Sequence, residues 1–265
     1  MTESVPILMY HAVAERPPPA TRRLSVTPES FEEQVAFLVD HGFTGMTFSD
    51  LADAFETGKA LPKRPVVLTF DDGYADFASD AWPILRRHDF PATVFVTTGW
   101  MADAGPNAAR GSLDKMLTRA QVRALAAAGV EIGAHTHSHP KLDQLPDALL
   151  RRELGDSRAL LQDCIGEPVT ALAYPFGYST PRVRLVARAA GYRRAAAVRN
   201  VRATSSDNLF MLPRLTIRRS TNRTIFAAIM AGADGRIFWR DRLLTAGWAS
   251  VRGVRRAGKW VLDHA

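Results

Sequence analysis

Short runs of apolar and β-branched residues alternate along this chain with longer stretches in which apolar residues recur every three or four positions. Such alternation is typical of strand–helix units arranged around a parallel sheet. We therefore expect helices between strands that span residues 5–10, 44–47, 65–70, 92–97, 130–134, 170–174, 193–198 and 211–217. The pattern predicts an α/β fold, and a chain of 265 residues has the size of a single α/β barrel.

Helix boundaries are marked by capping residues. Thr27 is followed by proline and glutamate, which favours a helix start there, and Thr118 with Gln121 resembles a capping box. Helical stretches are followed by glycine at positions 42, 129 and 191, as helices often are. Residues 99–117 show no regular pattern and are expected to form a long loop over one face.

The composition, with 46% hydrophobic and 23% charged residues, is that of an ordered globular protein. The only cysteine, Cys164, excludes an internal disulfide and a cysteine-based metal site. The first residues lack a basic stretch followed by a long apolar run, and no window approaches 18 apolar residues. We expect a cytoplasmic protein.

The chain carries a net charge of +7, concentrated near its end. Residues 235–265 contain seven Arg or Lys against two Asp, together with Trp239, Trp248 and Trp260. This composition suits a helix lying in an anionic membrane interface, which predicts peripheral contact with the inner membrane face. A solvated basic helix packed on the barrel is the alternative. The basic residues match no nucleic-acid-binding motif, so no nucleic acid partner is expected. We divide the chain into a barrel, 1–220, and a basic, mostly helical extension, 221–265.

Polar residues follow several of the expected strands. Asp71 and Asp72 come directly after strand 65–70, and His135 and His139 follow strand 130–134. Two histidines and a carboxylate are the ligands of a three-ligand catalytic zinc site. One carboxylate would bind the metal while its neighbour takes a proton from metal-bound water, and the cation would allow both to stay ionised. A simple turn with a helix cap is the alternative for Asp-Asp-Gly.

His11 follows the first strand, and Pro175 and Gly177 follow strand 170–174. Together with the aspartates and the histidine pair, they fall at the carboxyl ends of strands. This is the face on which α/β barrels keep their active sites.

Three motifs in order, TFDDG (69–73), HTHSH (135–139) and AYPFG (173–177), resemble the polysaccharide deacetylase family, carbohydrate esterase family 4 or NodB-homology domain. The resemblance spans about residues 5 to 217. It implies a distorted (β/α)7 TIM-like barrel and metal-dependent hydrolysis of N-acetyl groups on amino sugars.

By position, the resemblance implies that Asp71 is the general base. It also implies that Asp72, His135 and His139 bind the metal. The expected cofactor is Zn²⁺, with Co²⁺ or Ni²⁺ as alternatives. The backbone N–H of Phe176 would join the metal in holding the oxyanion.

The chain departs from the family pattern at two places. Many members have arginine at the position of Ala173, and Arg214 in LPRLTIR is a candidate substitute. The late Leu-x-Leu-x-His motif is missing. His11 in LMYH resembles the early histidine of poly-N-acetylglucosamine deacetylases, whose motif order is permuted, and is our candidate for the general acid. A hydrogen-bonded core histidine is the alternative for His11.

Substrate contacts are expected from side chains near these motifs, because sugars stack on aromatic rings. Core or rim packing is the alternative for the aromatic members. The candidates are Tyr10, Tyr74, Trp100, Pro175, Gly177 and Tyr178.

The sequence thus predicts a carbohydrate N-deacetylase acting on a glycan or on a lipid-linked glycan precursor. A catalytically inactive glycan-binding barrel is an alternative from another class. Deacylation of other acyl groups and cyclic-amide hydrolysis are alternatives within the enzymes, since a fold alone does not specify a reaction.

Overall fold

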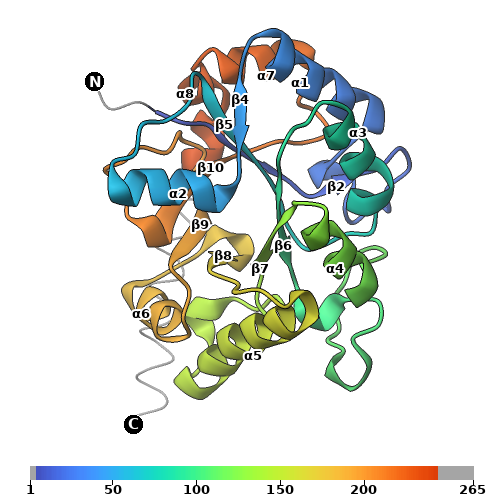
Figure 1. The fold of residues 1–265 in the computed structure, drawn as a ribbon, viewed down its shortest axis with the longest axis vertical. Helices are drawn as coiled ribbons and strands as arrows, with labels where there is room; N and C mark the ends of the chain where they lie inside the picture. The colour runs from blue at the N-terminus through green and yellow to red at the C-terminus, as the bar shows by residue number, and fades with distance from the viewer. Residues whose placement is uncertain (1–3, 244–265) are drawn as a thin grey trace.

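The computed structural model describes residues 4–243 of the chain. Strands and helices alternate along most of the chain, as the hydrophobic pattern predicts (Figure 1). The strands are β1 (Ile7–Tyr10), β2 (Ala12–Val13), β3 (Ser25–Val26), β4 (Thr44–Met46), β5 (Pro65–Phe70), β6 (Thr93–Val96), β7 (Glu131–Ala134), β8 (Ala171–Ala173), β9 (Arg194–Val198) and β10 (Leu212–Thr216). The α-helices are α1 (Pro28–Asp40), α2 (Phe48–Thr57), α3 (Trp82–Arg87), α4 (Arg119–Ala127), α5 (Asp147–Ile165), α6 (Pro181–Ala189), α7 (Arg223–Met230) and α8 (Asp234–Ile237).

Seven parallel strands close into a barrel in the order β1, β5, β6, β7, β8, β9, β10, and β10 pairs back with β1. The eighth strand of the sheet, β4, pairs with the first half of β5. Helices surround the strands (Figure 1). The predicted (β/α)7 barrel is therefore confirmed, and each of the eight expected strands is present within a few residues of its predicted bounds.

Local sequence signals account for the helix ends. The Thr27 hydroxyl accepts a hydrogen bond from the Ser30 N–H at 3.0 Å, and proline follows at the first helical position of α1. Thr118 and Gln121 form the predicted capping box at the start of α4. These caps satisfy backbone N–H groups that have no partner within the helix.

The core has two main layers. The larger cluster lies between the barrel and its helices, and it includes Leu68 and Phe70 of β5. The second cluster contains strand side chains that point to the other face of the sheet, together with residues of α2. It includes the small side chains Ala171, Ala173 and Ala196. Alanines leave space inside the barrel for larger polar side chains, which matters for the site described below.

The predicted extension from residue 221 onward begins with α7. Its residues Phe226, Ile229 and Met230 are buried in the larger core cluster, and α7 contacts α1. Up to residue 243 the extension therefore packs on the barrel. Trp248, Trp260 and most of the basic residues of the predicted membrane-contacting tail lie outside the described residues.

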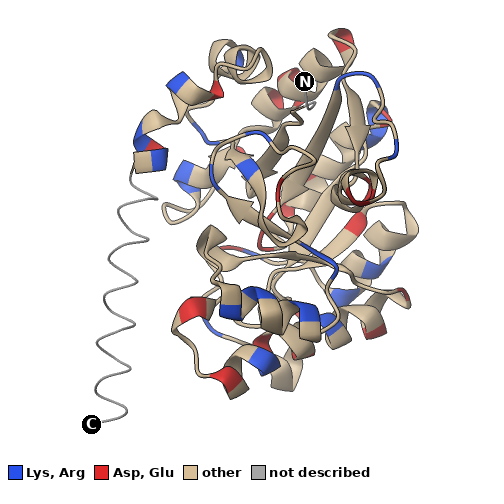
Figure 2. Cartoon of the chain, turned by 90° about the vertical axis from the view of Figure 1, so that its left-hand side faces the viewer, with Lys and Arg blue, Asp and Glu red and all other residues tan. Residues whose placement is uncertain are grey.

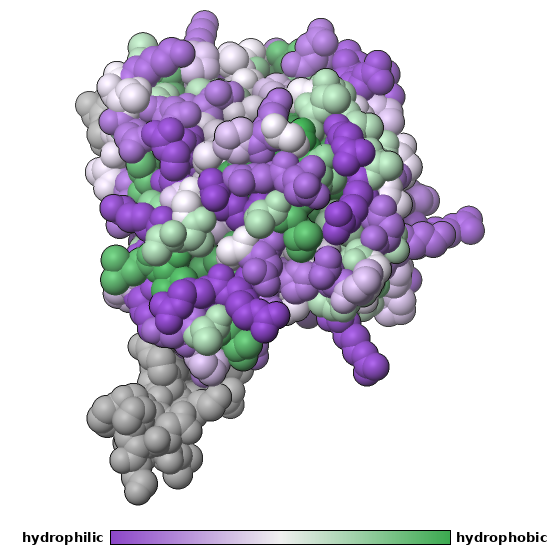
Figure 3. All heavy atoms as spheres, turned by 60° about the horizontal axis from the view of Figure 1, so that its bottom comes forward, coloured by the Kyte–Doolittle hydropathy of each residue, from purple (hydrophilic) through white to green (hydrophobic). Residues whose placement is uncertain are grey.

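Between residues 4 and 243, no helix combines the length and the apolar character needed to cross a membrane. Figure 2 shows Lys and Arg on several helices and loops of one side of the molecule, with Asp and Glu among them. On the face in Figure 3, hydrophobic side chains form patches separated by hydrophilic ones.

Candidate active site

The carboxyl end of β5 directs two neighbouring carboxylates into one cavity. In a regular strand, successive side chains point to opposite faces. Asp72 instead adopts the left-handed conformation with φ of 74°, and Gly73 follows with φ of 84°. This sharp turn directly after the strand brings the carboxylates of Asp71 and Asp72 to the same cavity, where both are buried. The Asp-Asp-Gly sequence is thus a turn, and the turn presents two acids to one site.

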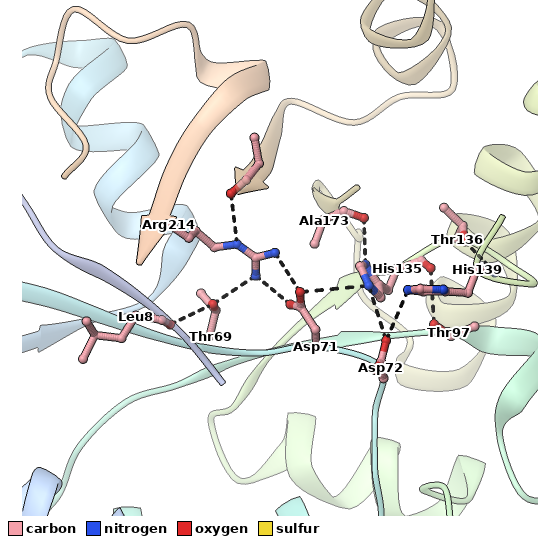
Figure 4. Close-up of polar contacts among 11 residues, drawn as sticks. Leu8, Thr69, Asp71, Asp72, Thr97, His135, Thr136, His139, Ala173 and Arg214 are labelled. Atoms are coloured by element: carbon pink, nitrogen blue, oxygen red, sulfur yellow. Dashed lines mark hydrogen bonds and ion pairs between the residues drawn. The ribbon is translucent and has the colours of Figure 1, made fainter. Parts of the chain in front are cut away.

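Asp71 is held by a buried arginine from the other end of the sequence. Nη1 and Nη2 of Arg214 donate to the two carboxylate oxygens of Asp71 at 2.6 Å and 2.7 Å (Figure 4). Arg214 Nη1 also donates to the Thr69 hydroxyl at 3.1 Å, and its Nε donates to the Ala197 carbonyl at 3.4 Å. Burial alone would raise the pKa of Asp71, but the charge and hydrogen bonds of Arg214 outweigh it and hold this pKa well below its usual range.

A potential metal site lies next to Asp71. Ligand atoms of Asp72, His135 and His139 lie within 4.8 Å of one another. Oδ1 of Asp72 is 3.4 Å from Nε2 of His135 and 3.5 Å from Nε2 of His139 (Figure 4). Asp72 Oδ1 is buried and accepts no hydrogen bond from any described residue. A buried carboxylate oxygen without a donor is costly unless a cation binds it.

The two histidines present the form that a metal requires. His135 Nδ1 lies 2.8 Å from the carbonyl oxygen of Ala173, so Nδ1 carries the proton and Nε2 offers a lone pair towards Asp72. Burial, reinforced by the neighbouring His135, lowers the pKa of His139 to about 4, which keeps its ring neutral. Two imidazoles and one carboxylate fit a divalent cation such as zinc.

The loop between the two histidines is held by α5. The Glu153 carboxylate accepts hydrogen bonds from the backbone N–H groups of His137 and Ser138, at 3.0 Å and 2.8 Å, and from the Ser138 hydroxyl at 2.5 Å. Thr136 and His139 both have positive φ, at 67° and 58°. Such backbone strain is sustained by surrounding contacts and is frequent at functional sites. Glu153 carries no signal in the sequence, since its role depends on this tertiary contact.

His11 and Tyr74 also line the cavity. Nδ1 of His11 is buried and without a hydrogen-bond partner in the described part of the chain. Burial lowers the pKa of His11, while Asp72 and Asp71 oppose that effect. Burial and the negative charge of Asp72 raise the pKa of Tyr74.

A cleft of about 580 Å³ opens in front of these groups. Its wall includes Trp100, whose ring lies 4.9 Å from that of His139, and the half-exposed ring of Phe176, at 4.8 Å from His139. Gly177 also lines the cleft. A Cβ atom on Gly177 would lie 2.5 Å from the side chain of Val198, so only glycine fits there.

The structure corrects part of the predicted set of substrate contacts. Tyr10 does not line the cleft, because it points outward from the barrel, stacks on Phe70 and donates a hydrogen bond to Gln34 at 2.8 Å. Pro175 is buried in the turn behind the cleft wall. Tyr178 is not part of the cleft lining, and it stacks on Phe176 with ring centroids 6.1 Å apart.

Other cleft residues were not predicted. Most come from loops or from strand positions without a motif, and the set combines apolar side chains with two arginines and two threonines. Its members are Met9, Thr21, Leu24, Arg110, Gly111, Leu113, Ser138, Val198, Thr216 and Arg218. The two-residue alternation along strands is one available signal, since it places Thr216 on the same face as Arg214.

Comparisons with known proteins agree with this geometry. In curated sequences, the chain is 26% identical over 224 residues to YxkH of Bacillus subtilis (strain 168), named as a polysaccharide deacetylase, with 84% of this chain and 75% of that protein covered. It is 26% identical over 205 residues to a poly-beta-1,6-N-acetyl-D-glucosamine N-deacetylase of Staphylococcus aureus (strain MSSA476), with 74% and 69% covered.

Among solved structures, the Streptococcus pyogenes deacetylase PplD, in complex with acetate, superposes with a TM-score of 0.77 at 28% identity and covers 87% of this chain and 99% of that one. The sequence model of the polysaccharide deacetylase family matches residues 58–195, which is more than half of the chain. This range contains the paired aspartates, the histidine pair and the AYPFG turn. The chain therefore belongs to the polysaccharide deacetylase family.

Proposed function

We propose that this protein is a metal-dependent hydrolase that removes N-acetyl groups from amino sugars of a glycan. As a member of the polysaccharide deacetylase family it is a carbohydrate N-deacetylase. The observation that carries the metal-dependent mechanism is the arrangement of Asp72, His135 and His139 directly beside the Asp71–Arg214 pair in one cleft. The name of the staphylococcal relative, a poly-beta-1,6-N-acetyl-D-glucosamine N-deacetylase, and the acetate bound to the streptococcal deacetylase support the choice of acyl group.

Asp72, His135 and His139 would hold the cation. A divalent ion bound there supplies a Lewis acid that acidifies water and polarises the acyl carbonyl. This contribution is needed because Arg214 makes Asp71 a weak base, fully ionised but with a pKa below its usual range.

In the proposed reaction, Asp71 accepts a proton from the attacking water as the water oxygen adds to the acetamide carbon. The backbone N–H of Phe176 donates to the developing oxyanion. His11, once protonated, donates a proton to the sugar nitrogen as the C–N bond breaks, so the products are acetate and a free amine.

The inactive-barrel alternative is opposed by the same contacts. Burying Asp71 together with Arg214 costs desolvation energy that well-packed apolar residues would avoid. A barrel that only binds glycan has no use for a second, ionised carboxylate beside the metal site. Hydrolysis of other amides uses the same groups, so the acyl specificity has to be tested with substrates.

The test is acetate release from a β-1,6-linked N-acetylglucosamine oligomer by the zinc-reconstituted protein. N-formyl and cyclic-amide compounds serve as comparison substrates. We expect release of acetate that is abolished by a chelator and restored by added Zn²⁺. Preferential hydrolysis of a formyl or cyclic-amide substrate would contradict the proposed acyl group, and no hydrolysis of any amide by the metal-loaded protein would favour the inactive barrel.

A further inference from the structure

Three buried side-chain atoms that line the cleft have no hydrogen-bond partner among residues 4–243: Asp72 Oδ1, His11 Nδ1 and Thr216 Oγ1. Buried polar groups are normally satisfied, so each exception calls for an explanation. The proposed metal accounts for Asp72, and the proposed proton transfer gives His11 a role. Thr216, of which 3% is exposed, has no role in the mechanism above.

Thr216 faces the inside of the barrel. It is the last residue of β10, two positions after Arg214, and side chains two apart on a strand point to the same face. Arg214 reaches Asp71 within the barrel, so the Thr216 side chain points the same way and lies closer to the cleft mouth. Its neighbour in register on β1 is Met9, which also lines the cleft.

The backbone of Thr216 is firmly held while its hydroxyl is left unused. The Thr216 N–H donates to Oδ1 of Asn200 at 2.9 Å. The Asn200 carbonyl in turn accepts two hydrogen bonds from Arg242, at 2.9 Å and 2.6 Å, and Arg242 pairs with Asp234 at 3.0 Å. The last described helical segment therefore fixes the strand end that carries Thr216. These backbone contacts hold the Thr216 hydroxyl in place although the hydroxyl itself makes no hydrogen bond to a described residue.

The order of the strands places Thr216 next to His11 and away from the metal ligands. Strand β1 lies between β10 and β5, so a path around the cleft runs from Thr216 to His11 to the paired aspartates. In the proposed substrate, a path from the acyl carbonyl passes through the nitrogen to the ring carbon and then to an oxygen on the next ring carbon. The groups of the substrate therefore match the residues around the cleft in order. The carbonyl lies at the metal site beside the aspartates, the nitrogen lies at His11, and the oxygen on the next ring carbon lies at Thr216.

We propose that the Thr216 hydroxyl binds this oxygen, on a ring carbon adjacent to the one that carries the amide. The inference rests on the proposed function and adds a substrate-specificity residue to it. The oxygen is either the C3 hydroxyl or the C1 glycosidic oxygen. Thr216 would thereby distinguish an N-acetylated sugar from a simple N-acetylated amine.

The test uses three probes: the methyl β-glycoside of N-acetylglucosamine, its 3-deoxy analogue and its 1-deoxy analogue. Thr216→Val keeps the shape of the side chain and removes the hydroxyl. We expect Thr216→Val to lower kcat/KM for the complete sugar by about tenfold, the size of one hydrogen bond in a desolvated site. For the analogue that lacks the contacted oxygen, the effect of the substitution should vanish, and Thr216→Ser should restore activity. Thr93→Val, at the opposite end of the barrel, is the control. It should leave the ratios of kcat/KM among the three probes unchanged.

Calorimetric titration of the same probes into Asp71→Asn and Asp71→Asn/Thr216→Val proteins tests the contact without turnover. The contact is overturned if Thr216→Val changes kcat/KM and binding equally for all three probes, or changes neither. Acetate release by the wild type would in that case leave the proposed function standing. Absence of acetate release together with analogue-dependent binding would contradict the function and retain the contact. A wild-type protein and Asp71→Asn variant that neither hydrolyse nor bind the sugar would contradict both.

Discussion

Arg214 and Asp71, separated by 143 positions in the sequence, form two parallel hydrogen bonds of 2.6 Å and 2.7 Å inside the barrel. The guanidinium is fully buried, and its bidentate geometry fixes the orientation of the carboxylate as well as its charge. Arg214 comes from β10, whereas the residue at position 173 on β8 is alanine. The contact makes Arg214 the side chain that positions the proposed base.

We predict that Arg214→Gln shifts the acid limb of the kcat/KM profile to higher pH. Without the guanidinium, only His135 and His11 oppose the effect of burial, so the pKa of Asp71 rises and the base is ionised only at higher pH. The free energy of unfolding should also fall by about 3 kcal/mol or more, since a buried charge is left unpaired. Steady-state kinetics across pH and urea unfolding measure the two effects.

Arg194 provides the matched control. It is also a buried arginine on a barrel strand, but it lies at the opposite end and pairs with Asp53 at 2.6 Å. Arg194→Gln should lower stability and leave the acid limb in place. An unchanged acid limb in Arg214→Gln would show that Arg214 does not control the ionisation of the base.

Gly177→Ala should damage the cleft wall more than an equivalent change elsewhere. Gly177 and Gly58 have the same φ of 73°, but a Cβ on Gly177 meets Val198 at 2.5 Å whereas one on Gly58 meets nothing within 4 Å. Gly58→Ala should therefore cost only about 1 kcal/mol for the left-handed backbone. Gly177→Ala should cost clearly more and reduce acetate release at least tenfold, and equal thermal unfolding and activity of the two variants would refute the steric account.

Asp76 gives a pH-dependent prediction away from the metal site. Burial, reinforced by Asp114 and Asp80, raises the pKa of Asp76 to about 7 against the hydrogen bond from Val13. An unfolded aspartate titrates near pH 4, so the folded state binds more protons between about pH 4 and 7. Stability from this group is thus present below pH 4 and is lost as pH rises through 7.

Asp76→Asn should consequently be neutral at pH 4 and stabilising at pH 8, by on the order of 2 kcal/mol after allowing for partial exposure. Thermal unfolding across pH measures this difference. Asp163→Asn, at an exposed position on α5, is the control. A difference between Asp76→Asn and wild type that is the same at pH 4 and pH 8 would contradict the assignment.

We further propose peripheral contact between the end of the chain and an anionic membrane. Trp239 and Leu243 are 51% and 64% exposed, and the Arg240 guanidinium lies 5.1 Å from the Trp239 ring. Aromatic and basic groups together favour the interface of anionic bilayers. The full chain should float with anionic vesicles at low salt, less so after Trp239→Ala/Leu243→Ala, and it should not float with neutral vesicles. A protein that stays at the bottom of the gradient at low salt would end this proposal.

Local patterns were sufficient to predict the strands and the motif residues at their carboxyl ends. The hydrophobic run before Asp71 and the pattern before His135 each define where a strand stops, and parallel strands bring those ends together. Tyr10 was expected to contact substrate, although the alternation of side chains along a strand places it away from the cleft. Met9 of β1 faces the cleft, so its neighbour Tyr10 on the same strand faces outward.

Tertiary contacts were harder to predict. Arg214 was a candidate from the family resemblance alone, because its contact with Asp71 requires that β10 close the barrel against β1, beside β5, which no local pattern reveals. The same holds for Glu153, which reaches the histidine loop from α5. These groups have ordinary sequence surroundings and become part of the site only through the closure of the barrel.

The most direct test of the account measures metal content and acetate release on the same preparations of wild type, Asp71→Asn and Asp72→Asn. The two substitutions are chemically identical and affect adjacent residues. We predict that Asp71→Asn retains bound metal but loses acetate release, whereas Asp72→Asn loses both, because only Asp72 belongs to the ligand cluster. Equal metal content in all three proteins, or full activity of Asp71→Asn, would contradict the division of roles between the two carboxylates.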